Sequence, residues 1–330
     1  MSGLNRNIGI ISLLGLKGIG QAFIKKNVNN SSFSDEVFSE VKQILARTGK
    51  QFESKDLETS FEKASEIVSL ASHGGILILN VFDTDYPKQL LGLKDAPAIL
   101  YLKGNLNLLK DVSIGIIGTR NPNANGLKIA EKISMHYQSK NWAICNGLAE
   151  GIDRASIMQG ENLYGKVIGV IAGGIDFTQK KTLLKSTMAT AEKVLQNNGL
   201  LVSEEALDKK EDTFTVVKSC RIQAGLSNGL LLVQSSIDGG SKYTLKSFSE
   251  LKKPLGVIRP LAEDIEDKSY EANRLLINEG IKALEKITEL KAEKIRVASL
   301  TTIASKLDYD NFDSLVEKGT SHITDQSTLF

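Results

Sequence analysis

The sequence predicts an α/β protein centred on a doubly wound parallel sheet, with a small helical domain before it and a helical C-terminal tail. Apolar runs typical of buried strands recur between residues 111 and 260, and helical patterns separate them, which is the alternation that builds parallel sheets. The runs have no polar face, as expected for central strands that helices cover on both sides. We expect these strands at residues 112–118, 142–146, 167–173, 200–203, 229–234 and 255–259.

These patterns divide the chain into three parts. Residues 1–73 contain amphipathic helical runs, and Gly18-Ile19-Gly20 separates two of them, either as a helix-hairpin-helix or SAM-like phosphate contact or as a plain helix–helix turn. Residues 74–262 begin with a β-type run and contain the predicted sheet, within which residues 153–162 have a helical pattern. Residues 263–330 are charged and weakly patterned, which predicts a helical segment or a frayed tail.

Charge, cysteine and histidine content, and the lack of long apolar runs limit the possible classes of function. The net charge is +2, and residues 111–260 carry 19 Lys and Arg against 14 Asp and Glu, a net of +5, which modestly supports a polyanionic partner. The two cysteines and three histidines stand at no disulfide or metal-ligand spacing, so we expect no metal and no cofactor. No leader pattern and no apolar run of about 18 residues occurs, so we expect a cytoplasmic protein without membrane contact.

Small, glycine-rich segments follow the predicted strands. Ligands of open parallel sheets bind beyond the carboxyl ends of the strands, an edge that we call the crest. The segments expected there are Gly118-Thr119-Arg120, Asn146-Gly147, Gly173-Gly174 and Gly240-Ser241-Lys242. Turns between strands and helices need glycine anyway, but four on one crest favour backbone N–H groups that bind phosphate at helix N-termini.

Charged and aromatic side chains near these turns suggest how a nucleic acid is held. Arg120 at the tip of the first strand is placed to bind a phosphate bidentately, or else to pair with a crest carboxylate such as Asp153. Lys180, Lys181 and Lys242 add positive charge, and Phe177 is a candidate for stacking against a base.

Enzymatic signatures are missing from this crest. The first strand ends in GIIGTR (115–120), which does not match G-x-G-x-x-G, and no G-x-x-x-x-G-K-[ST] occurs. The histidines are too scattered along the sequence to support a His-based triad. We therefore expect a binding protein that is not an enzyme.

Six ordered segments together resemble the DprA/Smf family. They are Gly118-Thr119-Arg120, Asn146–Asp153, Gly173–Asp176, Gly199–Glu204, Arg221–Ser227 and an upstream segment with Asp85-Tyr86-Pro87 and Leu100–Asn105. The resemblance covers roughly residues 10–260 and implies an extended Rossmann-like fold, usually dimeric. It implies binding and protection of single-stranded DNA and loading of the RecA recombinase in natural transformation, without turnover. It also adds Arg221 to the DNA-binding candidates, as the one arginine kept from the family's F-P-x-R-N-R segment.

Departures from the family pattern leave two other functions open. Glu150 replaces an arginine, Ile157 a histidine and Gln234 an acid, so several polar groups of the crest differ. A sensor of a small nucleotide-type ligand, for example in phage defence, is the first alternative. A nucleoside-phosphate glycosidase is the second, but only half of its P-G-G-x-G-T-x-x-E motif is matched, by residues 238–241, and no glutamate follows at the required offset.

Overall fold

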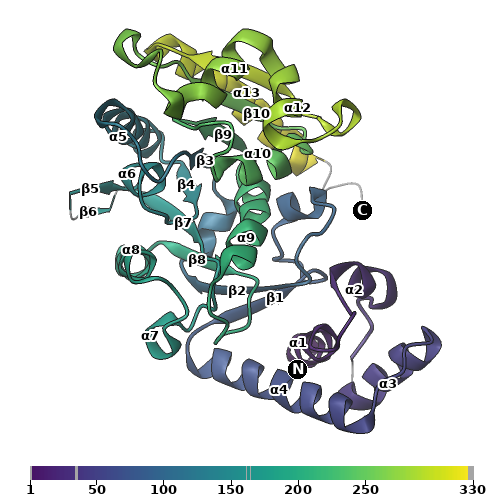
Figure 1. The fold of residues 1–330 in the computed structure, drawn as a ribbon. Helices are drawn as coiled ribbons and strands as arrows, with labels where there is room; N and C mark the ends of the chain where they lie inside the picture. The colour runs from purple at the N-terminus through teal and green to yellow at the C-terminus, as the bar shows by residue number, and fades with distance from the viewer. Residues whose placement is uncertain (1, 34–35, 161, 164, 326–330) are drawn as a thin grey trace.

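The N-terminal helices form a layer against one end of a large sheet. The computed structural model describes residues 2–33, 36–160, 162–163 and 165–325. The helices of this layer are α1 (Ser2–Leu14), α2 (Gln21–Asn27), α3 (Val37–Arg47) and α4 (Ser54–His73). Figure 1 shows them beside the first two strands, and the Asn7 amide donates to the Ile78 carbonyl oxygen at 3.1 Å, which ties α1 to the sheet.

The sheet has nine strands in the order β1-β2-β8-β7-β4-β3-β9-β10-β11. Their bounds are β1 (Leu77–Asn80), β2 (Ile99–Gly104), β3 (Ser113–Ile117), β4 (Ala143–Asn146), β7 (Lys166–Val170), β8 (Leu200–Ser203), β9 (Gly229–Leu232), β10 (Pro254–Ile258) and β11 (Ser299–Ile303). From β8 to β11 all neighbours pair in parallel, whereas β2 pairs antiparallel with β8 and with β1. The predicted doubly wound sheet is confirmed.

The strand order locates the switch point of the sheet. The chain enters the parallel part at β3 and continues to β4, β7 and β8 on one side, then returns to β9, β10 and β11 on the other. Loops therefore leave β3 and β9 in opposite directions. In sheets of this topology the crevice between two such loops is where ligands bind.

Helices cover both faces of the sheet. They are α5 (Ala124–Ser139), α6 (Ile152–Ala155), α7 (Phe177–Lys180), α8 (Lys185–Gln196), α9 (Thr213–Leu226), α10 (Ser241–Ser249), α11 (Glu271–Glu279), α12 (Ala283–Thr288) and α13 (Lys306–Asp325). Shorter 3-10 turns are η1 (Lys88–Gly92), η2 (Leu106–Lys110), η3 (Ala262–Asp264), η4 (Lys268–Tyr270), η5 (Gly280–Lys282) and η6 (Ala292–Lys294).

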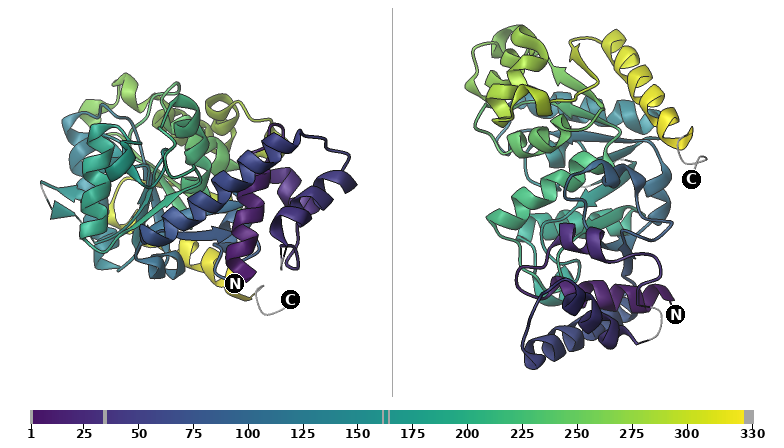
Figure 2. Two further views of the ribbon diagram at one scale, coloured as in Figure 1. Left: turned by 90° about the horizontal axis from the view of Figure 1, so that it is seen from below. Right: turned by 90° about the vertical axis from the view of Figure 1, so that its right-hand side faces the viewer.

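Alternation along the strands explains the two layers. On β9, Leu231 joins a buried cluster with α5, α8 and α13, while Leu230 and Leu232 join a second cluster with α9, α10 and α11. Figure 2 shows α13 on one side of the sheet and α11 with α12 on the other. Within the described ranges, no helix has both the length and the apolar character needed to cross a membrane.

Two segments differ from the sequence-based expectation. The helix expected at residues 153–162 is wrong, because only α6 forms and a short hairpin follows, β5 (Met158–Gln159) with β6 (Asn162–Leu163). Gly160 has φ +59°, the left-handed conformation that turns this hairpin.

The C-terminal segment contains a strand that its weak pattern did not indicate. Strand β11 pairs in parallel with β10, so the segment after residue 262 extends the sheet. Helix α13 then packs over the sheet through Phe312 and Val316. The buried Asp313 carboxylate fastens it to α5, accepting bonds from His136 at 2.8 Å, Tyr137 at 3.1 Å and Lys140 at 3.0 Å.

Candidate functional site

The loops that leave β3 and β9 meet at the switch point. The Thr119 N–H donates to the Gln234 carbonyl oxygen at 2.7 Å, which joins the two loops directly. Arg120, the next residue, is exposed, and it takes part in none of the ion pairs found within the described residues. The alternative pairing of Arg120 with Asp153 is therefore not formed, and the guanidinium faces solvent.

The Gln234 side chain fills the crevice between these loops. It is buried, its Oε1 accepts a bond from the Asn123 N–H at 3.3 Å, and its amide donates to the Ser269 hydroxyl. A Cβ atom at Gly126 would lie 2.0 Å from Gln234 Oε1, so the first turn of α5 closes tightly over the amide. The Gln234 amide therefore occupies the space between the β3 loop and the first turn of α5.

Asp153 lies buried under the loop that follows β4. Its Oδ2 accepts the Gly147 N–H at 3.0 Å and the Ala149 N–H at 3.4 Å. Burial raises the pKa of this carboxyl to about 7. The two N–H groups and the positive charge of Arg120 act in the opposite direction, but their effect is smaller. The Asn146 amide donates to the Asp153 carbonyl oxygen at 2.9 Å.

Two of the predicted anion ligands therefore have structural roles. Asn146 is buried and holds the loop, and the Gly147 N–H is already bonded to Asp153. The prediction that the Gly147 amide binds a phosphate is wrong in this conformation, because a buried carboxylate occupies that donor.

The loop after β7 is also packed inward. The Gly174 N–H donates to the Lys209 carbonyl oxygen at 2.8 Å, and a Cβ at Gly174 would lie 2.2 Å from the Ala206 oxygen. A Cβ at Gly173 would lie 2.4 Å from the Thr182 oxygen. These two glycines let neighbouring backbones approach each other, and the Gly174 amide is not free for the predicted phosphate contact.

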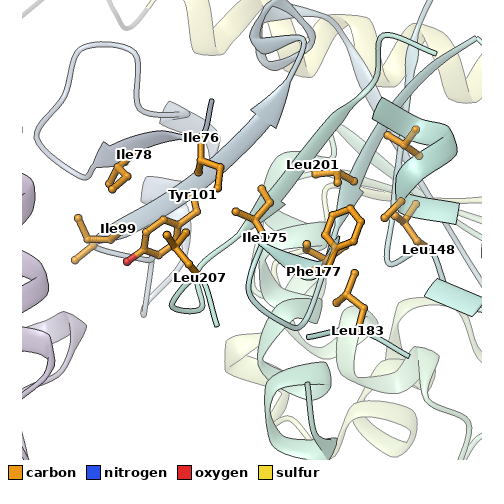
Figure 3. Packing of buried hydrophobic residues seen from close by; sticks show 14 of the residues in the cluster. Ile76, Ile78, Ile99, Tyr101, Leu148, Ile175, Phe177, Leu183, Leu201 and Leu207 are labelled. Carbon is orange, nitrogen blue, oxygen red and sulfur yellow. The ribbon is translucent and has the colours of Figure 1, made fainter. Parts of the chain in front are cut away.

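Phe177 and Arg221 cannot play the parts expected of them. Only 1% of Phe177 is exposed, and Figure 3 shows its ring among Ile175, Leu183 and Leu201, so it offers no face to a base. The Arg221 side chain is buried as well. Its guanidinium forms a two-pronged ion pair with Glu204 and lies 2.9 Å from an Asp95 oxygen.

The remaining candidates lie at the surface or next to it. Open space surrounds the Cβ position of Gly240, at the N-terminus of α10, and the buried Ser241 hydroxyl behind it has no hydrogen-bond partner among the described atoms. Lys242 is partly exposed, 4.0 Å from an oxygen of each of two exposed carboxylates, Asp238 and Glu289. Lys180 and Lys181 are exposed beyond the loop after β7.

Sequence patterns missed two segments of the crest. Lys209, Lys210 and Phe214 are exposed on the segment that leads from β8 into α9. A D-x-x-T capping signature in the sequence predicts the start of α9, but it does not predict that the Phe214 ring is exposed to solvent. Residues 263–271, which we call the acidic segment, also reach the crest.

The fold and the crest define a class of protein. A doubly wound sheet with an exposed arginine at its switch point and lysines along the crest is a Rossmann-like protein suited to an anionic ligand. Residues 77–294 match the family described as DNA recombination-mediator protein A, and the chain belongs to this family.

Several curated proteins are similar in sequence. DNA processing protein DprA of Bacillus subtilis is 32% identical over 192 residues, which cover 57% of this chain and 62% of the relative. DprA of Streptococcus pneumoniae is 30% identical over 219 residues, 65% of this chain and 73% of the relative. Protein Smf of Escherichia coli is 28% identical over 161 residues. The chain thus matches less than two thirds of the B. subtilis protein and 42% of the E. coli protein.

Two solved structures share the fold. DprA from S. pneumoniae superposes with a TM-score of 0.63 at 23% identity, over 94% of each chain. DprA from Helicobacter pylori, whose structure describes a single-stranded DNA binding mode, has a TM-score of 0.52 at 23% identity, over 62% of this chain and 88% of that one.

Proposed function

We propose that this protein binds single-stranded DNA along its crest, protects it and passes it to a RecA-type recombinase during natural transformation, without enzymatic turnover. The observation that carries the proposal is the solvent-facing guanidinium of Arg120 at the switch point, on the same crest as the open N-terminus of α10. A guanidinium fits a phosphate bidentately, and helix N-termini add backbone donors. The DNA-binding relative from H. pylori supports the choice of ligand.

A polymer fits this crest better than a small nucleotide does. The Gln234 side chain lies buried between the two loops of the switch point, the place where dinucleotide-binding proteins of this topology hold their nucleotide. A strand that lies over the crevice still contacts Arg120 and the lysines, each through its own phosphate. The nucleotide sensor and the glycosidase are therefore less well supported.

The partners of the proposed function follow from the family. A homodimer and a RecA-type recombinase are the protein partners that the resemblance implies, and the proposed function implies a cytoplasmic location. Size-exclusion chromatography with light scattering tests for the homodimer, and co-elution with RecA from oligonucleotide-coated beads tests for the recombinase contact.

The proposal is tested by filter binding of oligo-dT and of a duplex of equal length across a salt series. We expect the wild type to prefer oligo-dT, and Arg120→Ala to weaken binding and to flatten the salt dependence by about 0.7 log units per decade of salt, the loss of one phosphate contact. Arg296→Ala is the matched control, since Arg296 is also exposed but lies at the opposite edge of the sheet, before β11.

Two results would contradict the proposal. Equal affinities and salt slopes for the two arginine variants would remove Arg120 from the site. Thermal stabilisation by nucleoside phosphates with none by oligo-dT would favour the sensor, and release of free base from nucleoside monophosphates would favour the glycosidase.

A further inference from the structure

We propose that the bound strand has one course along the crest, from Arg120 towards the β7 and β8 side, where Phe214 stacks against a base, and that the acidic segment excludes it from the β10 side. The inference rests on the proposed function and adds to it a stacking residue and a direction. Figure 1 shows the two sides of the sheet that the proposal distinguishes, with α7 and α8 beside β8 and α11 beside β10.

Phe214 has the geometry of a stacking residue. Its side chain is 73% exposed, whereas the rest of α9 is buried from Ser219 to Leu226. A capping box fixes this end of the helix: the Asp212 carboxylate accepts the Thr215 N–H at 2.8 Å, and the Thr215 hydroxyl accepts the Asp212 N–H at 2.9 Å. The ring is therefore held outward on a rigid helix end, and stacking a base on it orders little else.

A single exposed apolar residue is ordinary, so the charges around Phe214 matter. Two loops that we call the basic flank, residues 178–185 and 208–214, lie side by side, because the Glu211 N–H donates to the Thr182 oxygen at 2.9 Å. They carry five exposed lysines, which are Lys180, Lys181, Lys185, Lys209 and Lys210.

The carboxylates of the basic flank are mostly engaged. It has three, at Asp208, Glu211 and Asp212, against the five lysines. Glu211 binds the Leu184 N–H, and Asp212 caps α9 and lies 3.1 Å from Lys209. An aromatic ring among lysines is the combination that holds single strands, since bases stack and phosphates are neutralised.

The basic flank is continuous with the crest. The Gly174 N–H, at the end of the loop after β7, donates to the Lys209 carbonyl oxygen, so the flank begins where that crest loop ends. Arg120 packs against the loop after β4, since a Cβ at Gly151 would lie 2.6 Å from the Arg120 Cα. In the proposed course, a strand that contacts Arg120 continues over the loop after β7 to Phe214.

The opposite side of the switch point repels phosphate. The acidic segment has five carboxylates and one lysine in nine residues, the carboxylates being those of Glu263, Asp264, Glu266, Asp267 and Glu271. Asn123, three residues after Arg120, holds it at the crest by donating to Asp264 and Asp267 at 3.0 Å each. Hydrogen bonds from Ser269 lower the pKa of Asp267, which keeps this carboxylate charged. Like charges so near Arg120 direct a polyanion to the other side.

The stacking residue is tested with the full-length protein and fluorescein-labelled oligo-dT. We expect Phe214→Ala to weaken binding about fivefold to tenfold, the lower end of the effect of removing one base–aromatic stack, and Phe214→Trp to keep the affinity. Leu307→Ala is the matched control, because Leu307 is equally exposed, at 74%, but lies on α13.

Tryptophan fluorescence reports stacking of a base directly, whereas a loss of affinity could also follow from a less stable variant. The only tryptophan of the wild type, Trp142, is 7% exposed, so a new exposed indole dominates any ligand-induced change. Oligo-dT should quench the added emission of Phe214→Trp by stacking and should leave that of Leu307→Trp unchanged.

The direction of the course is tested by charge reversal. Lys209→Glu with Lys210→Glu should weaken oligo-dT binding, whereas the control pair Lys291→Glu with Lys294→Glu, exposed between α12 and β11 and outside the basic flank, should weaken it much less. Equal losses in the two pairs, or a Phe214→Ala variant that binds like the wild type, would overturn the inference while leaving the proposed function standing. A wild type that binds no oligo-dT would instead overturn the proposed function.

Discussion

Asp153→Asn isolates the energetic effect of a carboxyl that is buried beneath the crest. In the native protein burial raises the pKa of Asp153 from 3.8 to about 7, so the folded chain binds this proton about 3 pH units more tightly than the unfolded chain does. Because the unfolded chain releases the proton first, native stability falls as the pH rises from about 4 to 7. At 1.36 kcal/mol per unit, the loss amounts to about 4 kcal/mol.

The asparagine variant lacks this titration and keeps an amide oxygen that can accept the Gly147 N–H. We therefore expect its free energy of unfolding, relative to the wild type, to rise by about 2–4 kcal/mol between pH 4.5 and pH 8. Urea denaturation followed by circular dichroism at several pH values measures this difference. Asp310→Asn is the control, since Asp310 is exposed on α13 and its variant should follow the wild type in parallel. Parallel curves for Asp153→Asn as well would refute a buried, proton-binding Asp153.

Two further predictions concern buried polar groups outside the crest. The Lys253 Nζ donates to the Gly225 and Ser227 oxygens at 2.7 Å, and burial lowers the pKa of this amine to about 7. The free energy of unfolding of the wild type should therefore rise from pH 7 to pH 10, and Lys253→Met should flatten that rise in thermal melts. An unchanged slope in the variant would contradict the prediction. Asp313→Ala leaves His136, Tyr137 and Lys140 without their buried acceptor. We expect the free energy of unfolding to fall by about 3–5 kcal/mol and the amides of α13 to exchange faster. Amides of α13 that stay protected would show that Asp313 does not fasten the helix.

Local patterns were sufficient for the central sheet. The parallel strands β3, β4, β7, β8, β9 and β10 were each predicted within a few residues, because a run of buried apolar residues between helices has few other conformations available. Strand β11 was missed because its sequence, SLTTI, is half polar, and only its pairing with β10 makes it a strand. The hairpin at residues 158–163 was missed because a helical pattern that short is weak evidence.

The residue types of the site were evident in the sequence, but their accessibility was not. Phe177 and Phe214 both begin helices near the crest, yet only 1% of the first is exposed and 73% of the second. Arg120 and Arg221 have the same chemistry, but Glu204 and Asp95 occupy the guanidinium of Arg221. Those partners come from segments far away in the chain. The sequence by itself thus determined the sheet, the glycine-rich crest and the family, because these depend on local spacing. Only the tertiary structure decided which cation and which ring face a ligand, because burial depends on what distant segments pack over each side chain.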